Sequence, residues 1–153
     1  MKTVTSRGGA LEFKVPDDWR AEPDPDGNGN IFFPPDDPDT TLRLDVLTFK
    51  PPSRLTRPRA IDALKANFDS DAPPRELPNG SALATSLEEV EETGVRFMMR
   101  YWYLAHVRSR REVYVAIFSL ALPPGGSGKT ASQHPLVALF DSEVVSARFA
   151  WQK

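Results

Sequence analysis

The sequence contains no cysteine, and only two of its 153 residues are histidine. The lack of cysteine excludes a disulfide, a thiol nucleophile and a cysteine-linked lipid anchor. His106 and His134 make a poor metal set, and neither stands in a sequence context typical of a catalytic triad. We therefore predict no catalytic residues and no cofactor, and the sequence gives an enzyme no support.

Long apolar runs are also lacking. No stretch approaches the ~20 apolar residues that a membrane span needs, and the first residues do not resemble a secretory signal. If Met1 is the natural start, we expect a cytoplasmic protein. The formal net charge of −2 argues against nucleic acid or anionic lipid as the main partner, because both require a concentrated positive field.

What the sequence does have is the composition of a globular protein, with 40% hydrophobic and 26% charged residues. We expect one domain over residues 1–153. It is organised around two predicted strands, Val95–Ala105 and Glu112–Ala121, rich in β-branched and aromatic residues. Because a strand alternates between its faces, one face of the first strand carries Phe97 and Tyr101 and the other carries Trp102.

Further periodic segments predict partners and covers for this hairpin. Strands are expected at 11–15, 31–33, 41–50 and 82–92, with an extended piece at 145–151; helices are expected at 57–70 and 135–146. Trp19 is interpreted as a core residue. Thr93-Gly94 is short enough to join two strands directly, so three consecutive antiparallel strands follow. These elements predict a mixed α/β domain with the hairpin near the centre of an antiparallel sheet, since edge positions favour charge and proline.

One acidic turn resembles a calcium loop. Asp24, Asp26 and Asn28, with Gly29 and Ile31, match the first eight positions of an EF-hand. Proline stands where the bidentate acid should be, and neighbouring prolines leave no room for flanking helices. The turn is therefore a weak metal candidate, and an Asp/Asn/Gly connection between strands is the favoured interpretation.

A second segment resembles a phosphate-binding loop. Gly128-Lys129-Thr130 follows a predicted strand and precedes a predicted helix. The first glycine of that motif would fall at Pro123, and proline has neither the amide donor nor the freedom to wrap a phosphate. We interpret the segment as a connection.

Basic residues gather on the hairpin. If residues 93–94 form a two-residue turn, the register places Glu91 opposite Arg96, and the acidic run 88–92 neutralises much of the positive charge. A slip of one residue would put this pair on opposite faces. The basic set is Arg96, Arg100, Arg108, Arg110 and Arg111.

Taken together, the segments resemble one known group. The fragment 13–19 (F-x-V-P-x-x-W), the 41–49 strand, the 94–121 hairpin and a closing helix that ends in S-x-x-F at 146–149 are similar to the PsbP/DcrB-like group. The resemblance implies an α+β fold, an α/β/α sandwich with a central antiparallel sheet and two main helices. It also implies binding in preference to catalysis, because the group includes type VI secretion effector chaperones and a Ran-binding release factor.

The leading functional prediction is a non-enzymatic cytoplasmic protein-binding module, a chaperone or adaptor in a bacterial secretion setting. The two predicted helices must be shared between two sheet faces, and we expect them to cover first the core face, which carries Phe97, Tyr101 and Tyr103. We therefore expect the other face to bind a protein partner, such as an apolar helix, with a homodimer as an alternative. The predicted partner-binding residues are Met98, Arg100, Trp102, Leu104, Arg108 and Arg110.

The rival prediction is a small-ligand or calcium-responsive binding protein that uses the Asp24–Asn30 loop, and an enzyme ranks third.

Overall fold

The computed structural model describes residues 1–37, 39–50, 57–122 and 134–152, which form two sheets and two helices. No helix in these ranges is both long and apolar enough to cross a membrane. The strands are β1 (Lys2–Thr5), β2 (Leu11–Val15), β3 (Arg20–Pro23), β4 (Asn30–Phe33), β5 (Thr41–Phe49), β6 (Arg75–Glu76), β7 (Ala82–Glu92), β8 (Val95–Ser109), β9 (Glu112–Leu122) and β10 (Arg148–Phe149), and the helices are α1 (Ala60–Asn67) and α2 (Pro135–Ser146).

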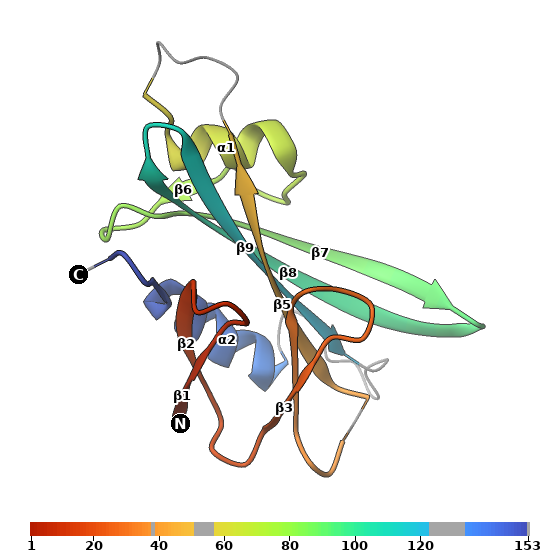
Figure 1. Cartoon of the computed structure of the whole chain (residues 1–153). Helices are drawn as coiled ribbons and strands as arrows, with labels where there is room; N and C mark the ends of the chain where they lie inside the picture. The colour runs from red at the N-terminus through yellow and green to blue at the C-terminus, as the bar shows by residue number, and fades with distance from the viewer. Residues whose placement is uncertain (38, 51–56, 123–133, 153) are drawn as a thin grey trace.

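The larger sheet contains the predicted hairpin at its centre. Its strand order is β3-β4-β5-β9-β8-β7-β6, and every neighbouring pair is antiparallel. The short strands β3 and β6 occupy its two ends, whereas the long apolar strands β8 and β9 lie inside it (Figure 1). The predicted central position of the hairpin is confirmed.

The turn between β7 and β8 has the predicted length and register. Thr93 and Gly94 both have positive φ, at 51° and 78°, as a type I′ turn requires. Glu91 lies opposite Arg96, as predicted. Arg96 also forms exposed ion pairs with Glu91 and Glu89, at 3.8 and 3.5 Å. Exposed pairs of this kind contribute little stability, so the turn is the main determinant of register.

This sheet is the middle one of three layers (Figure 1). On one face α1 packs its buried Leu64 over small residues of the sheet, such as Ala84 and Ala105. On the opposite face lie α2 and the small sheet, whose strand order is β1-β2-β10. The predicted α/β/α sandwich is confirmed, and the small sheet shares the layer of α2.

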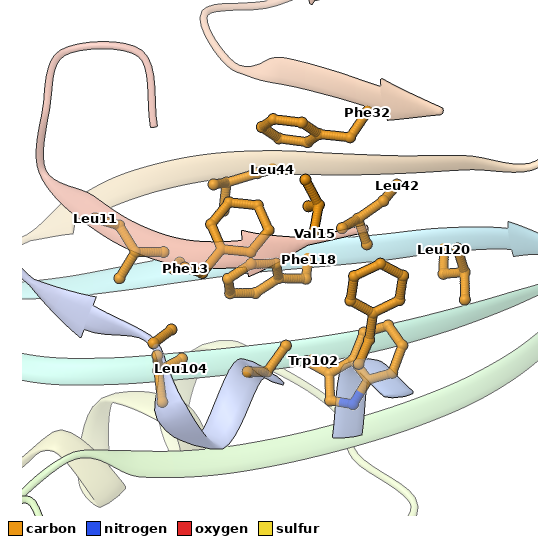
Figure 2. Packing of buried hydrophobic residues seen from close by; sticks show 14 of the residues in the cluster. Leu11, Phe13, Val15, Phe32, Leu42, Leu44, Trp102, Leu104, Phe118 and Leu120 are labelled. Carbon is orange, nitrogen blue, oxygen red and sulfur yellow. The ribbon is translucent and has the colours of Figure 1, made fainter. Parts of the chain in front are cut away.

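The larger core lies between the small sheet and the large one (Figure 2). Phe13 of β2 stands edge-on between Phe32 and Phe118, with ring centroids 5.2 and 5.1 Å away. Such edge-to-face contacts add to the stabilisation that burial gives. Trp19, 4% exposed, packs against Phe140 of α2 at 5.4 Å, and its predicted core position is confirmed.

Helix α1 is shorter than predicted. The expected helix 57–70 is helical only over Ala60–Asn67, and its N-cap residue Arg59 makes no side-chain capping bond. At the other end Phe68 turns to extended backbone and stacks on Tyr103 with ring centroids 4.5 Å apart. This shortening decides how much of one sheet face is covered.

Strands β1, β3 and β6 were not predicted. Every residue of β3 and β6 is exposed, so these strands have no alternation of apolar and polar residues. The predicted extended segment 145–151 contains a strand only at β10, because α2 continues to Ser146.

Candidate partner-binding surface

The sheet face predicted to bind a partner is buried at its centre. Trp102 and Leu104 are both 0% exposed, within the core formed with α2 and the small sheet (Figure 2). Phe140 of α2 packs on Trp102 with ring centroids 6.3 Å apart. The prediction that this face is available to a partner is therefore wrong. The reason is that β2 and α2 both cover it, whereas the sequence predicted only helices as covers.

Two further residues of that predicted set are engaged within the chain. Met98 is half-buried against the larger core. Arg100, whose side chain is 16% exposed, donates a hydrogen bond of 3.3 Å to Asp141 of α2, and its guanidinium carbon lies 5.5 Å from the Trp102 ring. Both residues therefore help to attach covering elements to the sheet.

At the hairpin tip, Arg108 contacts the C-terminal segment. Its guanidinium donates to the Tyr114 hydroxyl at 3.0 Å and lies over the Trp151 ring, 5.3 Å from the centroid. This cation–π contact fixes the tip to the end of the chain. Arg110 is exposed. A role of Arg108 and Arg110 in partner binding stays a prediction.

The two histidines have separate structural contacts. His106 Nδ1 accepts a 2.7 Å hydrogen bond from Trp151 Nε1, so its neutral form carries the proton on Nε2. Burial lowers the pKa of His106. His134 precedes α2 and caps it, because its Nδ1 accepts from the backbone N–H of Leu136 at 3.1 Å.

The Asp24 turn is organised by contacts within the chain. Asp24 is 6% exposed; its Oδ1 accepts from the Asp26 N–H at 2.9 Å, and its Oδ2 lies 3.5 Å from Arg43 Nη1. Burial, followed by the charge of Asp24, raises the pKa of neighbouring Asp45. Throughout the described ranges, no group of three or more His, Asp or Glu side chains is placed to hold a metal ion.

The rest of that turn has a structural explanation as well. Asn28 is exposed in the turn between β3 and β4. Gly29 is required because a Cβ there would collide with the backbone carbonyl of Leu44. The glycine that matched the calcium motif is therefore explained by a close approach of two strands. The segment Gly128-Lys129-Thr130 lies outside the described residues.

Among the described residues, a partly uncovered surface lies on the α1 side of the sheet. The packed cluster under α1 reaches Tyr103 but does not include the next residues of that face toward the turn. Phe97, Met99 and Tyr101 are half-buried, and Val95 is 55% exposed. The register adds one apolar residue from each neighbouring strand. We call this surface the open face, and it consists of Val90, Val95, Phe97, Met99, Tyr101 and Ala121.

Acidic residues border the open face along β7. Glu88 and Glu92 lie on the same face of the strand as Val90, one on each side of it. Tyr101 donates its hydroxyl proton to Glu88 at 2.9 Å, and burial together with Glu88 raises the pKa of Tyr101 to about 12. Tyr101 is therefore neutral at physiological pH, and the negative charge at this border comes from the glutamates.

Phe97, Tyr101 and Tyr103 were predicted to form the core face. Tyr103 packs against the cluster under α1, but Phe97 and Tyr101 lie beyond that cluster, so the prediction is wrong for these two residues. Both faces of β8 carry large apolar residues, so the period of two could not identify Phe97 and Tyr101 as uncovered. The informative signal was the length of the α1 segment. A helix that begins after Pro58 and ends before Phe68 cannot extend over the full length of β8.

No family model matches the chain, and no curated protein matches its sequence. Solved structures do share its fold. A crystal structure from Bacteroides thetaiotaomicron has a TM-score of 0.59 and 19% identity; the match covers 97% of this chain and 48% of that one, so this chain spans about half its length. LpqN of Mycobacterium tuberculosis, described as involved in cell envelope biogenesis, also has a TM-score of 0.59, with 12% identity and coverage of 97% and 89%.

PsbP (CyanoP) from Synechocystis sp. PCC 6803 has a TM-score of 0.43 and 12% identity, over 97% of this chain and 91% of that one. Over the described residues, the expected α+β sandwich with two helices and antiparallel strands is confirmed, and the first two of these structures share this fold.

Proposed function

We propose that the chain is a non-enzymatic protein-binding module, a chaperone or adaptor that receives an apolar helix on the open face. The observation that carries this proposal is the row Val95, Phe97 and Met99, which lies beyond the cluster under α1 and is only partly buried. Contiguous apolar surface of this kind is typical of protein-binding sites. The proposal keeps the predicted type of partner and moves its binding site to the opposite face of β8.

The acidic border indicates the charge of the partner. Glu88 and Glu92 stand along one side of the apolar row, and an apolar helix with lysine or arginine on the matching side would complement them. An amphipathic helix binds such a surface through apolar side chains three and four residues apart on one of its faces. These side chains could pack against the row of large side chains on β8. A secretion setting and a cytoplasmic location stay predictions.

Site-specific photo-crosslinking tests the proposal. A benzoylphenylalanine residue in place of Phe97 should form an adduct with a protein partner in native cell extract. The same residue in place of Lys14, which is exposed on β2 in the other layer, should not form that adduct. Identification of the adduct by mass spectrometry then shows whether the bound segment is an apolar helix.

A second substitution provides the matched control. Met99→Ser should abolish the adduct and cost little stability, because Met99 is only half-buried. Equal adducts from both positions, or an adduct only with a second copy of the chain, would contradict the proposal.

A further inference from the structure

The outer edge of β7 has no strand partner over most of its described length. β6 pairs with β7 only at Ala82 and Leu83, and the Thr85 carbonyl accepts a bond of 3.0 Å from the Asp71 N–H. Beyond Thr85, no strand of the described ranges pairs with residues 86–92 on this side. An unpaired strand edge is a template for a further strand.

Existing hydrogen bonds show which backbone groups face outward. The carbonyls of Ser81 and Thr85 accept bonds from outside the β7–β8 pair, and both residues have odd numbers. In an antiparallel strand the N–H and C=O of one residue point to the same side, and the side alternates along the chain. The outward groups on the unpaired stretch are therefore those of Leu87, Glu89 and Glu91.

This edge is acidic, and it borders a groove. The groove is lined in part by Asp69, Asp71 and Glu88, and Phe68 and Tyr103 stack within it at 4.5 Å. The ion pairs between described residues do not include any of these three carboxylates. A lysine or arginine side chain from outside could therefore place its stem on the aromatic rings and its charge among the acids.

We infer that the outer edge of β7 binds an extended, basic segment of another protein by strand addition, with one basic side chain in this groove. A second copy of the chain is a poor occupant, because antiparallel pairing of two β7 edges would bring the acidic run 88–92 against itself. Strand addition uses main-chain bonds for affinity and alternate side chains for specificity. The inference does not depend on the open face, because the main-chain bonds would form at the outer edge of β7, although Glu88 borders both surfaces.

Hydrogen exchange with a designed peptide tests the inference. The probe is a nine-residue peptide in which lysine alternates with valine or threonine, and the control peptide has glutamate in place of each lysine. With the basic peptide bound, the amides of Leu87, Glu89 and Glu91 should exchange at least about tenfold more slowly, because they would donate hydrogen bonds to the backbone of the peptide. Amides of Glu88 and Val90 already face β8, so their exchange should change little.

Two substitutions at one position separate the backbone from the charge. Glu89→Pro removes an outward N–H without removing a bond to β8, and proline is tolerated on edge strands in this orientation. Glu89→Thr removes the same carboxylate and keeps the N–H. We expect Glu89→Pro to weaken peptide binding at least tenfold relative to Glu89→Thr, with both variants folded by circular dichroism.

If the proline variant does not fold, the hydrogen-exchange pattern of the wild-type protein with the two peptides still tests strand addition. No binding of the basic peptide, equal binding of the acidic peptide, or binding that leaves the odd-numbered amides unprotected would overturn the inference. Binding that protects those amides but is accompanied by formation of a dimer of the chain would overturn it as well.

Discussion

The Trp102 indole nitrogen donates a 2.7 Å hydrogen bond to Asp141 Oδ1, joining the centre of β8 to α2 across 39 residues of sequence. Arg100 donates to the same oxygen at 3.3 Å. The carboxylate thereby satisfies a buried N–H that would otherwise cost free energy, and it fixes α2 on the sheet. This contact is why the face that carries Trp102 belongs to the core.

Replacement of Trp102 should therefore destabilise the folded protein. We expect Trp102→Ala to lower the free energy of unfolding by about 3 to 5 kcal/mol, because it leaves a large cavity beside Phe140. Trp102→Phe retains most of the ring and removes the bond to Asp141, so its cost should be smaller, about 1 kcal/mol. Urea denaturation measures both variants. A loss below about 1 kcal/mol for Trp102→Ala would contradict the assignment of Trp102 to the core.

The centre of the fold could be predicted from the sequence because its determinants are local. The alternation in β8 and the two residues Thr93-Gly94 are sufficient to predict the strands and their register. In the same way Pro135 and the apolar spacing after it predicted α2 with its observed bounds. Each of these signals lies within a few residues of the feature it determines.

The site could not be predicted because it depends on which element covers which face. Both faces of β8 are apolar, with Phe97 and Tyr101 on one and Met98 and Trp102 on the other, so a period of two cannot separate them. The choice is made by contacts distant in sequence, such as Phe13 against Phe118. Exposed short strands such as β3 give no periodic signal at all.

Stability should fall at mildly acidic pH because of His106. Burial lowers the pKa of His106 in the folded protein below the ordinary value of 6.5, so the unfolded chain binds this proton at higher pH than the folded chain does. The contribution is therefore fully present above pH 6.5 and is lost as the pH falls from there through the lower folded pKa. Protonation of Nδ1 would also break the bond from Trp151.

Thermal melts at pH 7.5 and 5.5 check the His106 prediction. The wild-type melting temperature should fall more over this range than that of His106→Gln, because a glutamine side chain does not titrate. His134→Gln serves as the control and should behave as the wild type does. Identical pH dependence in the wild type and His106→Gln would contradict the prediction.

Calcium should leave the melting temperature unchanged. Both oxygens of Asp24 already have partners, the Asp26 N–H and Arg43, and Pro35 stands in place of the bidentate acid of a calcium loop. A ligand that binds the folded state would stabilise it by RT ln(1 + [L]/Kd), so a melt in millimolar calcium detects even a weak site. A calcium-specific rise that Asp26→Ala abolishes would restore the calcium-responsive hypothesis, with magnesium as the control ion.

The turn between β7 and β8 offers a stabilising substitution. Thr93 has a φ of 51°, a left-handed conformation that β-branched residues adopt only under strain, although its hydroxyl donates to the Glu92 carbonyl at 2.8 Å. Asparagine tolerates this conformation, and Asn-Gly is the preferred pair in a two-residue type I′ turn. We expect Thr93→Asn to raise the free energy of unfolding by about 0.5 to 1 kcal/mol in chemical denaturation. Thr93→Val keeps the branched shape without the hydroxyl and should lower it. If asparagine gave no gain while Glu91 remained paired with Arg96, the turn would carry no strain to relieve.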